Sequence, residues 1–424
     1  METVHKRVFE KYAAYQDSGE YWMGKVPASW ELKKLKHVFH EKKITHNPEL
    51  NCGSISFGKV VYKDDDKIPV STKASYQEVL VGEFLINPLN LNYDLISLRI
   101  GLSDKNVVVS SGYIVLKDKE QIDKNYYKWL LHRYDVAYMK LLGSGVRQTI
   151  SFNHIANSLL AYPPLKEQTA IAQFLDDKTA KIDQAIAQKE QLIQLLKERK
   201  QAIIQQAVTK GLDPNTKMKG SGVDWIGEIP EHWEVVRFKN LFTQSRLATR
   251  EEDGTVTSYR DGEVTLRSNR RLTGYTEAVL EHGFQGIRKG QLVLNSMDAF
   301  EGAIGVSDSD GKCTPEYLVC DKIHSETEND YFAFLLREMA LAKYIQVICN
   351  AVRQRAVRIR FNNLASRFVA VPPHQEQRLI VNQIKTHSEK IDSGVAKIKT
   401  QIAKLKEYKA SLIDSAVTGK IKIV

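Results

Sequence analysis

Two stretches of the chain carry apolar residues at every seventh position, and each stretch follows a Pro-Pro pair. Proline is tolerated in the first turn of a helix, so each pair marks a helix start. A seam of this period over about four to five heptads is typical of a coiled coil. The seam positions are Leu175, Ile182, Leu196 and Ile203 in the first stretch and Ile384, Ile391, Ile398, Leu405 and Leu412 in the second, with Lys189 as the polar member.

These seams predict long helices over residues 163–212 and 372–424 that pair antiparallel with each other within one chain. A helix of about 44 residues spans roughly 66 Å. So long a helix overruns a domain of ~140 residues, which argues against the alternative in which each helix packs only on its own domain. Antiparallel pairing would relate the two halves by a pseudo-twofold axis, and the polar Lys189 would help to fix the register.

The chain is an internal duplication. Residues 162–212 align without a gap with residues 371–421 at an offset of 209, and residues 22–39 align with residues 225–242 at an offset of 203. The N-terminus carries DSGEYWMG, similar to the GSGVDWIG that follows the first long helix, so it resembles the missing tail of the second repeat. The predicted segments are 1–21 (this tail), 22–162 (first domain), 163–212 (first helix), 213–224 (linker), 225–371 (second domain) and 372–424 (second helix).

The middles of the two domains diverge strongly from each other. Short β-type runs such as VVYK, EFLINP and GQLVLNS are broken by turns and then give way to helical patterns, NYYKWLLHRYDVAYMKLL and DYFAFLLREMALAKYIQVI. These runs predict an α+β fold, with two globular domains separated by the long helices. Divergence confined to the middles favours one scaffold that presents two different surfaces.

The chain is basic, with a net charge of +10 and a pI of about 9.1, which favours a nucleic-acid partner. Alternation in RQRAVRIR would place arginines on one face of an extended segment, and arginine forks suit phosphates and guanine edges. A glycine loop in the first domain carries Arg and Gln, and Gln is a natural reader of adenine. For each loop the alternative is an ordinary solvated surface. The candidate DNA contacts are Asn90, Asn92, Ser144, Gly145, Arg147 and Gln148 in the first domain and Arg353, Gln354, Arg355, Arg358 and Arg360 in the second.

Catalytic signatures are absent from the sequence. There is no P-loop for ATP, no dinucleotide fingerprint after a strand and no complete amino-methyltransferase motif. The four cysteines lack metal-ligand spacing. The N-terminus lacks an apolar signal-peptide core, and no apolar run approaches the ~18 residues of a membrane helix. We therefore expect a cytoplasmic, non-catalytic chain that binds no cofactor or metal and contacts no membrane.

The chain resembles the specificity (S) subunits of type I restriction-modification systems over nearly its whole length. The resemblance rests on paired W-x-G-x-[IV]-P-x-x-W-E entries at Trp22 and Trp225 and on paired P-P-x-x-E-Q exits at Pro163 and Pro372. It implies two target-recognition domains, each reading one half of a bipartite site on double-stranded DNA. It also implies that the helices set the spacer between the half-sites and dock two modification (M) subunits.

Under this resemblance, the chemistry belongs to partners. The M subunits would bring S-adenosylmethionine and adenine methylation, and restriction (R) subunits would bring ATP, Mg²⁺ and cleavage. The second domain departs from the first at its loop, where CNAVRQRAVRI has no glycine and three more residues than GSGVRQTI. Two alternatives stay open: an orphan S protein that serves methylation only, and a coiled-coil protein-binding adaptor without DNA specificity.

Overall fold

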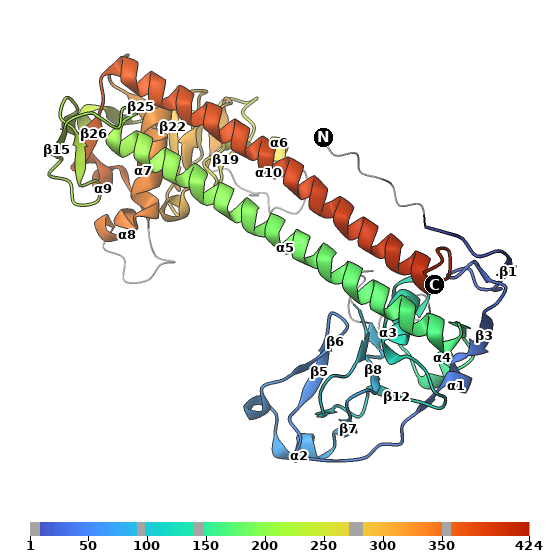
Figure 1. The fold of residues 1–424 in the computed structure, drawn as a ribbon. Helices are drawn as coiled ribbons and strands as arrows, with labels where there is room; N and C mark the ends of the chain where they lie inside the picture. Colours follow the sequence, from blue (N-terminus) through green and yellow to red (C-terminus); the bar gives the residue numbers. More distant parts are fainter. Residues whose placement is uncertain are drawn as a thin grey trace. The chain divides into compact units, whose positions relative to one another are not determined.

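The structure is a computed structural model that describes residues 9–90, 98–139, 142, 148–270, 283–349 and 358–423. The chain forms two compact units: unit 1 comprises Met1–Glu190 with Lys399–Val424, and unit 2 comprises Gln191–Ile398. Two long helices, α5 (Leu165–Lys210) and α10 (His374–Val417), contribute residues to both units (Figure 1).

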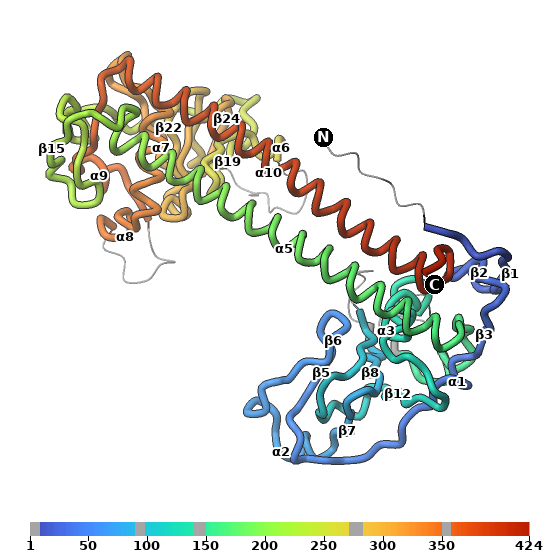
Figure 2. Tube along the Cα trace, in the orientation of Figure 1, coloured from blue at the N-terminus to red at the C-terminus, as the bar shows by residue number. Residues whose placement is uncertain are grey.

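The core of unit 1 is an antiparallel sheet in the order β10-β8-β12-β4, with the helix α3 (Lys124–Ala137) against one face (Figure 2). On this face the ring centroids of Phe39 and Tyr127 lie 5.4 Å apart. Leu85 and Val115 point to the other face, into a separate apolar cluster. Because both faces of the sheet are covered at its centre, the strand β8 is apolar and buried along its whole length. The strands are β4 (Phe39–Glu41), β8 (Phe84–Ile86), β10 (Ile100–Leu102) and β12 (Ile114–Asp118).

Short antiparallel pairs and helices surround this sheet in unit 1. The pairs are β1 (Tyr15–Asp17) with β2 (Lys25–Pro27), β3 (Glu31–Lys34) with β14 (Leu159–Tyr162), β5 (Gly53–Ser56) with β6 (Lys59–Tyr62), β7 (Gln77–Val79) with β11 (Val107–Val109), and β9 (Leu89–Asn90) with β13 (Gln148–Thr149). The short helices are α1 (Leu35–Val38), α2 (Val70–Ala74), α4 (Phe152–Ile155) and the 3-10 turn η1 (Asp65–Lys67).

Unit 2 has the same central plan, an antiparallel sheet in the order β18-β25-β22-β23 with α7 (Asn329–Leu341) against it. Val293 and Val319 take the places of Leu85 and Val115 and point into an equivalent apolar cluster. The sheet strands are β18 (Phe242–Gln244), β22 (Leu292–Asn295), β23 (Ile304–Val306) and β25 (Tyr317–Lys322).

The remaining elements of unit 2 are again short. The pairs are β15 (Met218–Gly220) with β16 (Glu228–Pro230), β17 (Glu234–Arg237) with β26 (Phe368–Val371), β19 (Val256–Ser258) with β20 (Val264–Leu266), and β21 (Gln285–Ile287) with β24 (Gly311–Cys313). The helices are α6 (Arg267–Arg270), α8 (Tyr344–Ile348), α9 (Phe361–Ala365) and the 3-10 turns η3 (Phe238–Asn240) and η4 (Ala299–Glu301).

Buried polar side chains show that the divergent middles share one scaffold. The Nε2 of Gln77 donates to the Tyr113 carbonyl oxygen at 2.6 Å, and the Nε2 of Gln285 donates to the Tyr317 carbonyl oxygen at 2.8 Å. The hydroxyls of Ser103 and Ser307 each donate to the carbonyl oxygen two residues ahead, at 2.6 and 2.7 Å. The middle parts of the two domains therefore share a backbone scaffold and differ in their surface side chains.

The long helices pair antiparallel within each unit (Figure 1). In unit 1 the Lys189 Nζ donates to Gln401 Oε1 at 2.7 Å, and in unit 2 the Lys200 Nζ lies 2.7 Å from Asp392 Oδ2. As one helix number rises, its partner's number falls, which is the antiparallel register. The structure buries Leu175, Ile182, Ile384 and Leu412 of the predicted seam and half-buries Leu196, Ile203, Ile391, Ile398 and Leu405.

The predicted helix ends were too late. The second helix was expected to reach residue 424, but α10 ends at Val417, two residues before Gly419 at φ +70°. The first ends at Lys210, directly before Gly211 at φ +72°. A left-handed glycine is a common helix stop because it lacks a Cβ. The helical pattern after residue 330 likewise divides into α7 and α8 at Lys343, whose φ of +60° cannot continue a helix.

The C-terminal end of each long helix docks on the globular part that it meets. The Tyr126 hydroxyl of α3 donates to the Val417 carbonyl oxygen at 3.1 Å, and the Tyr331 hydroxyl of α7 donates to that of Val208 at 3.2 Å. In unit 1, β1 from the N-terminal segment pairs with β2, as β15 pairs with β16 in unit 2. The N-terminal segment thus has in unit 1 the place that the segment after α5 has in unit 2.

Candidate nucleic-acid interface

A groove of about 430 Å³ crosses unit 2 where the sheet strands meet the segment that enters α9. Its positive charge comes from three exposed arginines, Arg246, Arg358 and Arg360. Arg358 Nε lies 3.1 Å from Glu316 Oε2, which is the acidic member of the lining. The other lining residues are Gln244, Ser296, Pro315, Tyr317, Leu318, Ile359, Phe361 and Asn362.

The arginine-bearing segment is held by its backbone and by one buried side chain. Ile359 is fully buried, and its N–H donates to the Ser296 carbonyl oxygen at 3.2 Å. The backbone of Arg360 is extended and its N–H donates to Asn363 Oδ1 at 2.9 Å, which caps α9. Because side chains alternate along an extended segment, burying Ile359 turns Arg358 and Arg360 outward together.

Unit 1 repeats this junction with uncharged residues. Ile150 is buried and its N–H donates to the Pro88 carbonyl oxygen at 3.1 Å, as Ile359 does to Ser296. The Ser151 N–H donates to His154 Nδ1 at 3.0 Å, in the manner of Arg360 and Asn363. At this junction Thr149 and Ser151 stand where unit 2 has Arg358 and Arg360. One frame therefore presents two different side-chain sets.

The structure also joins two of the predicted unit 1 segments. Gln148 of β13 and Asn90 of β9 are paired Cα partners in a short antiparallel ladder. The ends of β9 and β13 therefore lie side by side. The other predicted contacts lie outside the described residues: Asn92, Ser144, Gly145, Arg147, Arg353, Gln354 and Arg355.

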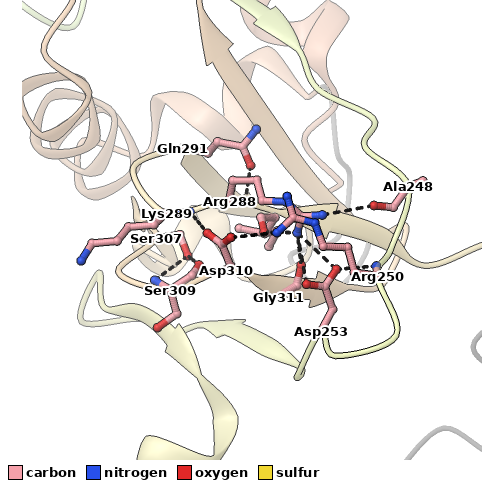
Figure 3. A network of polar contacts seen from close by, with 11 residues as sticks. Ala248, Arg250, Asp253, Arg288, Lys289, Gln291, Ser307, Ser309, Asp310 and Gly311 are labelled. Carbon is pink, nitrogen blue, oxygen red and sulfur yellow. Dashed lines mark hydrogen bonds and ion pairs between the residues drawn. The ribbon is translucent and has the colours of Figure 1, made fainter.

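The Arg288 side chain is hydrogen-bonded to other residues of unit 2 and stabilises the fold (Figure 3). Its Nη1 lies 3.2 Å from the Asp253 carboxylate and donates to the Ile287 and Gly311 carbonyl oxygens at 2.7 and 3.2 Å. Asp253 in turn accepts the Arg250 N–H at 2.8 Å. This network fastens the loop between β18 and β19 to the β21–β24 pair, so Arg288 is committed to internal partners.

In the basic stretch from Arg246 to Arg270, three arginines form ion pairs with carboxylates. Arg250 lies 3.2 Å from Asp310, Arg270 lies 2.9 Å from Asp261, and Arg260 pairs with Glu301. The Lys289 N–H donates to the Asp310 carboxylate and, with the nearby arginines, holds its pKa below the usual range. Arg246 is the member of the stretch that lines the groove. Sequence reasoning missed it because its neighbours in the chain are not its neighbours in the groove.

Reactive thiols, metal sites and membrane-spanning helices are the other features to consider in the described part of the chain. Burial raises the pKa of the Cys313 thiol to about 12 and also raises that of Cys320, which keeps both thiols protonated. Among the residues that the structure describes, no cluster of His, Cys, Asp and Glu is arranged to hold a metal ion. None of the helices in the described ranges combines the length and apolar character needed to cross a bilayer.

Comparison with known proteins gives a consistent result. Residues 27–195 match the family model described as a type I restriction modification DNA specificity domain. The putative type I restriction enzyme MjaX specificity subunit of Methanocaldococcus jannaschii is 24% identical over 433 residues, which cover 95% of this chain and 96% of that protein. The type I restriction enzyme EcoBI specificity subunit of Escherichia coli is 23% identical over 72% of this chain and 67% of its own length.

Solved structures share the fold. A chain from a study of complex assembly and conformational transition of the type I R-M system aligns over 92% of this chain and 98% of its own, with a TM-score of 0.65 and 13% identity. The HsdS subunit from Thermoanaerobacter tengcongensis aligns over 93% of this chain and 98% of its own, with a TM-score of 0.51 and 17% identity. The α+β domains and paired long helices predicted from the sequence are thus confirmed. The chain therefore resembles type I restriction-modification specificity subunits over most of its length, and residues 27–195 match the family's DNA specificity domain.

Proposed function

We propose that this chain is the DNA-reading subunit of a type I restriction-modification complex and that each unit reads one half of a bipartite site. The observation that carries the proposal is the shared junction at the start of α4 and α9. Its backbone hydrogen bonds are the same in both units, yet the sequence has the neutral Thr149 and Ser151 in unit 1 where unit 2 has the exposed Arg358 and Arg360. A common frame with interchangeable surface side chains is what reading two different half-sites requires.

The arginine groove of unit 2 has the chemistry of a DNA contact. Guanidinium groups bind phosphate oxygens and, in the major groove, the O6 and N7 of guanine. Arg246 and Arg360 are exposed, and Arg358 is paired with Glu316 at 3.1 Å. The net charge of +10 adds a long-range attraction for duplex DNA.

On this proposal the paired helices set the distance between the two half-sites and bind the modification subunits. Their polar cross-links, such as Lys409 Nζ to Asp183 Oδ1 at 2.7 Å, fix one antiparallel register, and one register gives one separation of half-sites. The partners on this proposal are two modification subunits and the restriction subunits of the complex. S-adenosylmethionine, ATP and Mg²⁺ are bound by those partners, and this chain contributes recognition without catalysis.

The test is to co-express the chain with its modification subunit and map methylated adenines across a genome. We expect one bipartite motif with a fixed spacer. A continuous motif contradicts two half-site readers, and a protein complex without methylation or DNA binding supports the coiled-coil adaptor instead. Adding the restriction subunit distinguishes a full system, which cleaves unmodified DNA, from an S protein that serves methylation only.

A further inference from the structure

The two units differ at one position whose surroundings are otherwise equivalent. Tyr126 and Tyr331 place α3 and α7 identically against the C-terminal ends of α10 and α5, through the hydrogen bonds to Val417 and Val208. Seven residues after each tyrosine, unit 1 has Arg133 and unit 2 has Glu338. The charge at this position is therefore reversed between the units.

In unit 1 the position is filled and paired by the chain itself. The Nε of Arg133 lies 2.5 Å from Asp414 Oδ1, and its Nη2 donates to the Trp22 carbonyl oxygen at 3.4 Å. Lys420 Nζ lies 2.6 Å from the second oxygen of Asp414. Trp22 is only 2% exposed. The end of α10, the Trp22 side chain and the Arg133 guanidinium therefore pack against one another.

In unit 2 the same place is a cavity of about 830 Å³. Gln205 stands at the position of Asp414, and Trp225, only half-buried, stands at that of Trp22. Neutral amides and a hydroxyl from α5 line the wall, and Gln201 donates a hydrogen bond to Glu338 Oε1. Glu338 is thus a carboxylate where unit 1 keeps a cation.

Among the residues that the structure describes, no cation forms an ion pair with Glu338, although the charge of Arg337 acts on it from a greater distance. Lys210 lines the cavity, yet no ion pair within 4.0 Å joins it to Glu338 in the part of the chain that the structure describes. Arg337, the preceding residue, donates to the Arg260 carbonyl oxygen at 3.5 Å. Glu338 itself is 7% exposed, and its burial raises the pKa of the carboxyl to about 7. A buried carboxylate of this kind is stabilised by an incoming positive charge.

Part of the cavity lining is apolar, and a further exposed apolar side chain lies on the neighbouring helix. Leu341, which lines the cavity, is 50% exposed, and Val347 on the adjoining α8 is 65% exposed. An apolar surround that shields a buried charge is the arrangement of a protein interface with a central arginine or lysine anchor. A small cationic solute would leave these side chains in water, so the surface favours a polypeptide.

We propose that the unit 2 cavity receives an arginine or lysine side chain of a partner polypeptide, with Glu338 as its counter-ion. This rests on the proposed function, because the partner is taken to be the modification subunit. Unit 1 supplies the equivalent cation from within as Arg133, so only the unit 2 docking surface depends on a charge from the partner. Binding of the copy at unit 2 therefore depends on a positive charge of the partner, and binding of the copy at unit 1 does not.

The test compares full-length complexes with the modification subunit for the unchanged chain, Glu338→Gln, Glu338→Arg and Glu328→Gln. The last is the matched control, since Glu328 is the N-cap residue at the other end of α7, away from the cavity. Native mass spectrometry counts bound copies, and titration gives the affinity of each. We expect Glu338→Gln to weaken one of two copies by about ten- to a hundred-fold. Glu338→Arg should remove that copy, and Glu328→Gln should change neither.

A charge swap separates recognition from a loss of structure. One arginine-to-glutamate or lysine-to-glutamate change on the modification subunit should restore binding to Glu338→Arg, which a misfolded surface could not do. Equal binding of two copies by the unchanged chain, Glu338→Gln and Glu338→Arg overturns the inference while leaving the proposed function intact. Failure of the unchanged chain to bind the modification subunit overturns both.

Discussion

Glu338→Gln should stabilise unit 2 at alkaline pH and leave its stability unchanged in acid. Burial raises the pKa of Glu338 from 4.5 to about 7, against the opposing effects of the Gln201 hydrogen bond and the Arg337 charge. Between these two pH values the native state holds a proton that the unfolded chain has released. Raising the pH through this window therefore favours the unfolded state.

The magnitude follows from the two pKa values. The contribution is fully present below 4.5, falls as the pH rises and is lost above about 7, a total of roughly 3 kcal/mol. The glutamine side chain does not titrate, has nearly the same shape and can still accept the Gln201 hydrogen bond. For a unit of this size, roughly 3 kcal/mol corresponds to a rise of roughly 6–12 °C in melting temperature.

The assay is urea denaturation of the free chain followed by circular dichroism from about pH 4 to about pH 8, for the unchanged chain and both glutamine variants. The difference in the free energy of unfolding between the unchanged chain and Glu338→Gln should open with rising pH. Glu328→Gln should run parallel to the unchanged chain throughout. A difference that stays constant with pH would refute the reasoning, because it would mean that Glu338 titrates alike in both states.

Three further changes probe the groove and the helices. Arg358→Ala should weaken DNA binding and reduce the slope of log affinity against log salt by about 1, which a salt titration measures. In a methylome map it should affect only the half-site of unit 2, and Arg250→Ala, outside the groove, should leave affinity, slope and half-site unchanged. Ile402→Ala, in the buried seam of unit 1, should lower its free energy of unfolding by about 2–4 kcal/mol in urea, and an exposed seam would show almost no change. Inserting one heptad into α5 between Lys189 and Lys200 and one into α10 between Asp392 and Gln401 should lengthen the spacer without altering either half-site, and altered half-sites in the methylation map would contradict the ruler assignment.

The features predicted well from the sequence are those carried by local, repeated patterns. The Pro-Pro pairs and seven-residue spacing located both long helices, because an amphipathic helix repeats its pattern every turn and proline is confined to its start. Runs such as EFLINP and GQLVLNS located β8 and β22. The alternation around Ile359 also predicted that Arg358 and Arg360 would share a face.

The features that escaped prediction join residues far apart in the chain. The arginine run contains no acid, yet the fold brings Glu316, the residue before β25, to within 3.1 Å of Arg358. Gln77 and Gln285 perform the same task in sequences too different to align by eye, since what they share is a partner carbonyl rather than a neighbouring motif. Arg133 and Asp414 are 281 positions apart, so their pairing is visible only after folding.

The charge reversal at Arg133 and Glu338 suggests how a duplicated scaffold acquires two roles. A buried carboxylate without an ion-pair partner lowers the stability of the free unit, and a neutral residue would be easy to place there. Positions where a chain departs from the rules that its own repeat obeys are expected at functional sites. Unit 1 shows that the frame accepts a fully paired version of this position, so the frame does not force the unpaired version on unit 2. The stability that unit 2 loses by burying the Glu338 carboxylate is regained only when a partner brings a positive charge. The ion pair of Glu338 therefore forms only on assembly.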